Sequence, residues 1–182
     1  MSNTMNPNNH QGPQGGNGNL ILIGMPGAGK STIGVVLAKR LGMGFVDTDL
    51  LIQMRCGRLL QEVIDNDGLE TFRALEEQTL KDFDVCNAVI ATGGSAVYSA
   101  EAMDHLSSIG TLIFIDVPLA ELQLRLRDMA TRGLVIDPGF TLADLYQQRL
   151  PLYRKYAQLT IDVGDRNLEQ VVEAICQEYG GL

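Results

Sequence analysis

Residues 20–41 read LILIGMPGAGKSTIGVVLAKRL, and they combine three local patterns. The apolar run Leu20–Ile23 favours a buried strand. The segment from Gly24 to Ser31 matches the pattern G-x-x-x-x-G-K-[ST]. Apolar residues then recur at helical spacing from Ile33 to Leu41. A strand, a tight loop and an amphipathic helix in this order predict a site that binds the phosphates of a nucleotide.

The residue types in the loop suit this role. Glycine lets backbone N–H groups come close to phosphate oxygens, and the start of the helix adds unpaired donors and the positive end of its dipole. We expect Lys30 to reach the β- and γ-phosphates of ATP and the Ser31 hydroxyl to bind Mg²⁺. An ordinary strand–turn–helix is the alternative, but this pattern arises by chance in roughly one such chain in a hundred or fewer. The predicted nucleotide-binding residues of the loop are Gly27, Ala28, Gly29, Lys30, Ser31 and Thr32.

Composition narrows the class of protein. The chain has 182 residues, of which 45% are hydrophobic and 20% are charged, as in a globular domain with a sizeable core. A net charge of −8 argues against general binding of nucleic acid, and no apolar run reaches the roughly 18 residues of a membrane helix. The three cysteines, Cys56, Cys86 and Cys176, are far apart in the sequence. We therefore expect reduced thiols and a cytoplasmic protein without nucleic-acid or membrane partners.

The chain divides into two compositional parts. Residues 1–19 are rich in Asn, Gly, Gln and Pro and contain no Asp, Glu, Lys or Arg, which predicts a disordered tail. From residue 20 to 182, further strand patterns at 44–49, 88–91, 111–116 and 159–163 alternate with helical ones. This alternation predicts one α/β domain with a parallel sheet covered on both faces.

Two acids stand at the end of the second predicted strand. Asp47 and Asp49 follow Phe45-Val46, and ligands collect at the carboxyl ends of strands in an open α/β sheet. One acid could hold water around Mg²⁺ while the other meets the substrate. Alternatively, Asp49 caps the helix that begins at Leu50. Asp116 ends another buried strand and competes with Asp47 for the role of magnesium partner.

Other polar groups follow later in the chain. Arg73 is three residues before Glu76, which could hold its guanidinium in place, although a lone helical arginine is usually just solvated. Gly93 and Gly94 follow a strand and invite backbone contacts to a ligand, with a plain turn as the alternative.

Two further segments carry predictions. The small residues around Arg132, within 130–138, suggest a mobile flap. Pro151 interrupts a helical pattern over 142–158 and predicts a kink or break near Leu150.

Taken together, these motifs resemble those of shikimate kinase, which has the P-loop nucleoside monophosphate kinase-like fold. The resemblance covers nearly all of residues 20–182. It implies a P-loop NTPase three-layer α/β/α sandwich with about five parallel strands and a lid at about 128–140. The motifs are GMPGAGKST at 24–32, FVDTD at 45–49, FRALE at 72–76, ATGG at 91–94, the lid arginine Arg132 and RLPLY at 149–153.

The resemblance also implies roles on the substrate side of the site. Asp49 would contact the hydroxyl that attacks the γ-phosphate. Arg73 and Arg149 would bind the substrate carboxylate, and the backbone of Gly93 and Gly94 would hold the ring hydroxyls. Arginine forks suit such anionic groups.

On the nucleotide side, the resemblance favours Asp47 over Asp116 as the residue that reaches Mg²⁺, through water, together with Ser31. Arg125 would lie against adenine, and Arg132 would close over the transferred phosphate. Lys30, Asp49 and Arg132 are therefore the expected catalytic residues.

The implied activity is ATP-dependent phosphorylation of the shikimate 3-hydroxyl by a monomeric enzyme, which gives shikimate 3-phosphate and ADP and serves chorismate and aromatic amino-acid biosynthesis. Three residues depart from the family pattern: Ser95 replaces a third glycine, Gly133 a proline after the lid arginine, and Leu69 a glutamate. The departures leave two alternatives open. One is a related kinase acting on another small hydroxy acid, and the other is a nucleotide-binding regulator without turnover.

Overall fold

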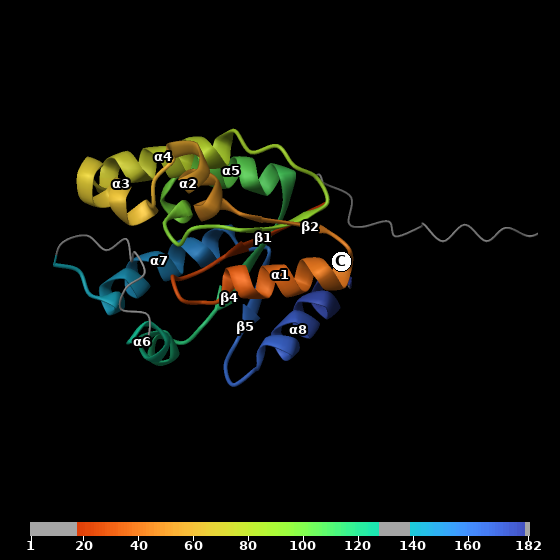
Figure 1. The fold of residues 1–182 in the computed structure, drawn as a ribbon. Helices are drawn as coiled ribbons and strands as arrows, with labels where there is room; N and C mark the ends of the chain where they lie inside the picture. Colours follow the sequence, from red (N-terminus) through yellow and green to blue (C-terminus); the bar gives the residue numbers. More distant parts are fainter. Residues whose placement is uncertain (1–17, 128–138, 181–182) are drawn as a thin grey trace, which may run out of the picture.

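A computed structural model describes residues 18–127 and 139–180 (Figure 1). Residues 1–17 of the predicted tail, Arg132 and Gly133, and the lid except Gly139 and Phe140 lie outside this part of the chain. In the described part, no helix combines the length and the apolar character needed to cross a lipid bilayer.

Five parallel strands form the central sheet, in the order β2-β3-β1-β4-β5. The α/β class and the parallel sheet predicted from the sequence are therefore confirmed. The strand β1 lies in the middle because its residues Leu20–Ile23 are fully buried and are covered on both faces. The strands are β1 (Asn19–Ile23), β2 (Gly44–Asp47), β3 (Ala88–Ala91), β4 (Gly110–Asp116) and β5 (Leu159–Asp162).

Helices cover both faces of the sheet. Figure 1 shows α1 and α8 together on one side and α4 and α5 on the other. On α7, the Tyr153 ring stacks on Phe114 of β4 with 5.1 Å between ring centres, which ties this helix to the sheet. The described helices are α1 (Lys30–Leu41), α2 (Thr48–Cys56), α3 (Leu60–Asp67), α4 (Leu69–Lys81), η1 (Ala96–Tyr98), α5 (Ala100–Ile109), α6 (Leu119–Arg127), α7 (Leu142–Tyr156) and α8 (Leu168–Gly180).

The domain begins one residue earlier than the sequence patterns indicate. Asn19 belongs to β1 rather than to the tail, and its side chain is buried. Its amide nitrogen donates to the carbonyls of Val85 and Ile109, at 2.7 and 3.0 Å, and its oxygen accepts from the Ala88 N–H. A buried amide with these partners fits the core, whereas the sequence pattern showed only a polar residue.

Helix α7 runs through Pro151 without the break that was one of two outcomes predicted near Leu150. Pro151 has no N–H to donate to the carbonyl oxygen of Gln147. Both residues are exposed, so water can donate a hydrogen bond to that oxygen instead. By contrast, the helical segment between residues 60 and 81 is broken at Gly68, which adopts φ 87° and ψ 163° between α3 and α4. Leu69 packs against a small apolar cluster that contains Phe72.

Candidate active site

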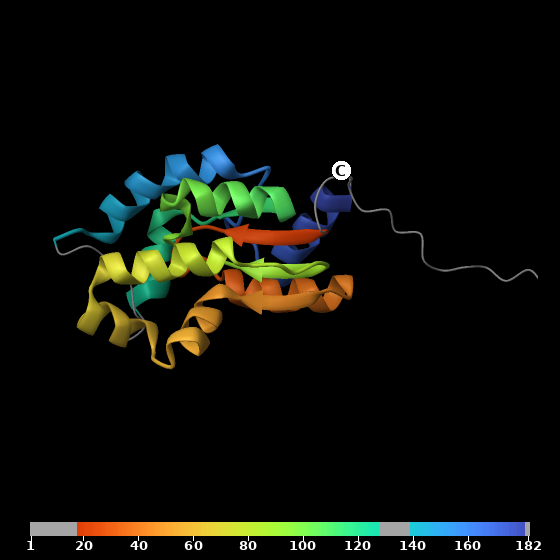
Figure 2. The same ribbon diagram turned by 90° about the horizontal axis from the view of Figure 1, so that it is seen from above.

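The loops that follow β1, β2 and β3 meet at one edge of the sheet, because these strands are parallel neighbours (Figure 2). They surround a cavity of about 400 Å³, here called the central cavity. Its lining includes Pro26, Gly27, Gly29, Lys30 and Ser31 of the phosphate loop (residues 24–31), Asp49 of α2, Phe72 and Glu76 of α4, the turn 92–95, and Arg149 of α7.

The phosphate loop depends on its glycines. Gly27 and Gly29 have φ of 78° and 89°, in the left-handed region that favours glycine. A Cβ on Gly24 would lie 2.8 Å from the carbonyl oxygen of Ile115, so a side chain there would push the loop off β4. The chain therefore turns tightly from β1 into α1, and the start of α1 borders the central cavity.

Lys30, the first residue of α1, is buried beneath the loop. Its ammonium donates to the carbonyl oxygens of Gly24 and Met25, at 2.7 and 2.9 Å. Burial lowers the pKa of Lys30 to about 8, although the nearby charge of Asp49 acts to raise it. A partly desolvated cation at the wall of the cavity is suited to bind an anion.

The two acids after β2 have different positions. The side chain of Asp47 caps α2, since its Oδ1 accepts from the backbone N–H groups of Asp49 and Leu50, at 3.0 and 3.4 Å. The capping alternative considered for Asp49 is therefore wrong: the helix begins at Thr48, and Asp47 caps it. Asp49 instead lines the central cavity, where burial and the nearby Asp47 raise its pKa.

Asp116, the other candidate for a magnesium partner, lies elsewhere. It is opposite Asp162 in the β4–β5 pairing, and its Oδ2 is 3.7 Å from a guanidinium nitrogen of Arg154. Burial raises its pKa, and Arg154 partly offsets this. The charges of Asp49 and Asp47 act on Lys30. This proximity supports Asp47 as the metal partner, which stays a prediction.

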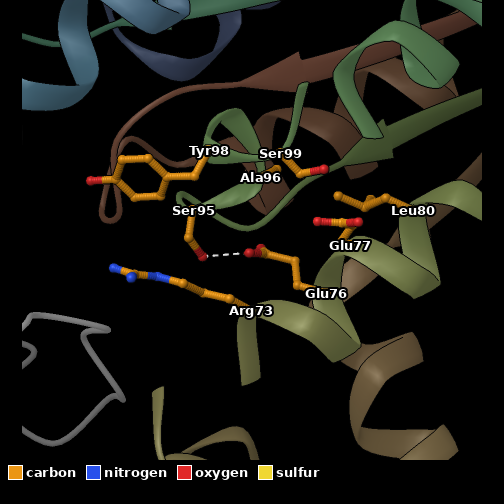
Figure 3. Close-up of a pocket in the computed structure, with 8 residues that line it drawn as sticks. All are labelled: Arg73, Glu76, Glu77, Leu80, Ser95, Ala96, Tyr98 and Ser99. Carbon is orange, nitrogen blue, oxygen red and sulfur yellow. Dashed lines mark hydrogen bonds between the residues drawn. The ribbon is translucent and has the colours of Figure 1, made fainter. Parts of the chain in front are cut away.

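Glu76 and Ser95 meet at the wall of the central cavity, as Figure 3 shows. The Ser95 hydroxyl donates to Glu76 Oε2 at 2.5 Å, and Glu76 is only 2% exposed. Burial raises the pKa of Glu76 to about 7, while the Ser95 hydrogen bond opposes that rise. The sequence resemblance marked Ser95 as a departure from the family pattern, but it did not indicate that the Ser95 hydroxyl would meet Glu76, because the two residues are distant in the chain.

The glycine pair after β3 is tightly enclosed. A Cβ on Gly93 would overlap Glu76 Oε1 and lie 2.9 Å from Asp49 Oδ1. The Gly93 N–H donates to the Thr48 hydroxyl, and the Gly94 carbonyl accepts from the Tyr153 hydroxyl at 2.7 Å. Both glycines line the central cavity, so their predicted contact with a substrate remains a prediction that this geometry permits.

The two predicted carboxylate-binding arginines come from different helices, yet both lie near one aromatic ring. Arg73 of α4 and Arg149 of α7 have their guanidinium carbons 5.2 and 5.0 Å from the ring centre of Tyr98. Arg149 lines the central cavity, and Arg73 lines an adjoining cavity of about 160 Å³ that shares Glu76 and Ser95 with it (Figure 3). No pattern in the sequence pointed to Tyr98.

Arg125 lies on the other side of the phosphate loop. One of its guanidinium nitrogens is 3.5 Å from the Gly27 carbonyl oxygen and 3.4 Å from that of Ala28, while Nε pairs with Glu121 at 3.1 Å. It borders a separate cavity of about 410 Å³ between the loop and α8. This position suits the predicted contact with adenine. Arg132, the predicted lid residue, lies outside the described residues.

The residues present fit ATP and one Mg²⁺. The glycine-rich loop has the left-handed backbone and the buried lysine that a triphosphate needs. Ser31 is exposed at the start of α1, and Asp47 uses one carboxylate oxygen for its cap, which leaves the other for a metal-bound water. Among the described residues, no three His, Cys, Asp or Glu side chains cluster as a metal site. A magnesium held mainly by phosphates and water does not require one.

Fold and site together define a P-loop protein of the nucleoside monophosphate kinase-like class. The family profile described as Shikimate kinase matches residues 26–179. A curated shikimate kinase from Synechococcus sp. is 39% identical over 162 residues, which span 87% of this chain and 84% of the relative. This chain belongs to the shikimate kinase family.

Solved structures agree with this assignment. Shikimate kinase from Acinetobacter baumannii, solved in complex with shikimate, superposes with a TM-score of 0.82 at 30% identity and covers 90% of this chain and 93% of its own. Shikimate kinase from Aquifex aeolicus superposes with a TM-score of 0.78 at 34% identity and covers 90% of this chain and 96% of its own. The P-loop nucleoside monophosphate kinase-like fold that the sequence resemblance implied for residues 20–182 is thereby confirmed.

Proposed function

We propose that this protein transfers the γ-phosphoryl group of ATP to the 3-hydroxyl of shikimate, giving shikimate 3-phosphate and ADP. One observation carries the proposal: a single cavity of about 400 Å³ is lined by Lys30 of the phosphate loop, by Asp49 and by Arg149. A phosphate-binding cation, an acid for the attacking hydroxyl and an arginine for a carboxylate are the groups that this transfer needs.

The positions of the described residues support a role for each of them. Lys30 and the N–H groups of the phosphate loop bind and neutralise the β- and γ-phosphates. Asp49 accepts a hydrogen bond from the attacking hydroxyl and orients it toward the γ-phosphate. Arg149 and Arg73 hold the substrate carboxylate. For Arg132, the sequence resemblance alone supports a catalytic role at the transferred phosphate.

We also propose that Mg²⁺ accompanies ATP, held by the Ser31 hydroxyl and, through water, by Asp47. The metal would supply positive charge to the phosphate oxygens. Arg125 would lie against adenine, since it packs along the outer side of the loop. The monomeric state and the cytoplasmic location stay predictions, as does the lack of nucleic-acid and membrane partners; the free thiols of Cys56, Cys86 and Cys176 are consistent with a reducing compartment.

Ser95, the departure that raised doubt about the substrate, has its hydroxyl hydrogen bonded to Glu76. The side chain therefore has a partner within the cavity wall, and the geometry favours no second substrate over shikimate. Gly133 lies outside the described residues.

The experiment is a panel of hydroxy acids assayed for ADP release with ATP and Mg²⁺. We expect turnover with shikimate at a kcat/KM at least about a hundredfold above that with gluconate, because polar groups of the site would be left unpaired by the wrong substrate. A kcat/KM with gluconate that equals or exceeds the value with shikimate would show that the substrate is another hydroxy acid. Tight ATP binding without turnover on any member would support a regulator.

A further inference from the structure

Tyr98 brings together two arginines that come from separate helices. It is the last residue of η1, directly after the turn that follows β3. The guanidinium carbons of Arg73 and Arg149 lie 5.2 and 5.0 Å from its ring centre. Both distances are within the range at which a cation is attracted to the face of an aromatic ring. Figure 3 shows Arg73 extending toward Tyr98 along the adjoining cavity.

The hydroxyl of Tyr98 is fixed as well. It accepts a hydrogen bond from Nε of Arg149 at 3.0 Å and donates one to Oε1 of Gln148 at 2.6 Å. Arg149 and Gln148 are neighbours on α7, so these two bonds tie η1 to that helix. The ring is thereby held in one orientation relative to both guanidinium groups.

The arrangement addresses an electrostatic difficulty. Two positive charges that must act on one carboxylate repel each other before the carboxylate arrives, and Arg149 is only 1% exposed, so water screens its charge poorly. The negative face of the ring and the hydroxyl oxygen offset part of that repulsion. They also reduce the side-chain freedom that would otherwise be lost when the substrate binds.

We propose that Tyr98 is a positioning residue that holds Arg73 and Arg149 ready for the carboxylate of the substrate. The inference rests on the proposed function, because it takes that carboxylate to be the ligand of both arginines. Tyr98 contacts both arginines and thereby sets how strongly the site prefers alcohols that carry a carboxylate.

The test compares Tyr98→Leu and Tyr98→Phe in steady-state kinetics with shikimate and ATP. Tyr98→Leu loses the ring and the hydroxyl, so we expect KM for shikimate to rise about tenfold while KM for ATP changes less than about twofold. Tyr98→Phe keeps the ring, and we expect a rise of about threefold. Tyr156→Leu is the matched control, because the Tyr156 ring faces Lys155 at 4.6 Å and lies outside both cavities.

A double-mutant cycle shows whether Tyr98 acts through an arginine. With Arg73 already replaced by alanine, Tyr98→Leu should raise KM for shikimate by clearly less than it does in the wild type. Equal effects in both backgrounds, or an equal rise of KM for ATP, would overturn the inference and leave Tyr98 a purely structural residue.

The inference and the proposed function fail in different ways. If Arg73→Ala raises KM for shikimate and Tyr98→Leu does not, only the role of Tyr98 is overturned. If Arg73→Ala and Arg149→Lys both leave KM for shikimate unchanged, the carboxylate site itself is wrong, and the role of Tyr98 falls with it. Thermal melting of each variant separates these outcomes from a loss of folded protein.

Discussion

The Ser95 hydroxyl donates a 2.5 Å hydrogen bond to Oε2 of Glu76, and this bond joins the turn after β3 to α4 at the wall of the central cavity. Both side chains are buried, with 5% and 2% of their surfaces exposed. Glu76 also lies near the charges of Asp49, Lys30 and Arg149. Its ionisation therefore affects both the folded state and the chemistry of the site.

Glu76→Gln should make stability less dependent on pH. The pKa of Glu76 rises from 4.5 to about 7 on folding, so the folded state binds this proton more tightly than the unfolded state. Glu76 thus contributes stability that is fully present below pH 4.5 and is lost as the pH rises through about 7. Above pH 7 we expect the variant to gain up to roughly 3 kcal/mol relative to the wild type.

The measurement is urea unfolding of the protein without ligands from pH 5 to 8. Glu77→Gln is the matched control, because Glu77 pairs with Lys81 at the protein surface, at 3.8 Å. Its stability curve should run parallel to that of the wild type. Parallel curves for Glu76→Gln as well would mean that burial does not perturb Glu76.

Gly93→Ala should damage both stability and activity. A Cβ there would overlap Glu76 Oε1 and lie 2.9 Å from Asp49 Oδ1, and neither side chain can move without disturbing the cavity. We expect a loss of about 1–3 kcal/mol in the free energy of unfolding, together with a lower kcat. Gly44→Ala is the control, since a Cβ there would meet its nearest atom at 3.6 Å. Wild-type activity in Gly93→Ala would refute the close packing.

Lys30→Met should weaken ATP binding and nearly abolish turnover. The ammonium is the cation of the phosphate loop, and its carbonyl partners Gly24 and Met25 place it beside the expected phosphates. We expect kcat to fall at least about a hundredfold, the scale of losing one electrostatic contact to the transferring group. Calorimetric titration with ATP and an ADP-release assay measure the two effects. Lys39→Met, at the exposed end of the same helix, should behave as the wild type does.

Asp49→Asn should lower kcat far more than it weakens ATP binding. The carboxylate lines the cavity but does not cap α2, so its loss leaves the helix and the phosphate loop in place. We expect kcat to fall by about 10²–10⁴-fold, the usual contribution of general acid–base catalysis. The assay is ADP release at saturating ATP and shikimate. Undiminished kcat would exclude Asp49 from the reaction.

Much of the site followed from short stretches of sequence. The turn from β1 into α1 requires glycines at φ 147° and 89°, and these are Gly24 and Gly29, the two fixed glycines of the sequence pattern. Buried parallel strands are apolar throughout, so β3 could be placed from Ala88–Ala91 alone. The role of Asp47 as the cap of α2 was missed, because Asp47 and Asp49 both stand where a helix can begin.

Local pattern thus revealed the phosphate loop, the parallel sheet and the acids at the strand ends, because backbone geometry and strand burial act over a few neighbouring residues. Tertiary structure alone decided which distant side chains meet: Ser95 with Glu76, and Tyr98 with Arg73 and Arg149. Those contacts depend on how α4, α7 and η1 pack over the sheet. Such packing is set by the whole core rather than by the residues that touch.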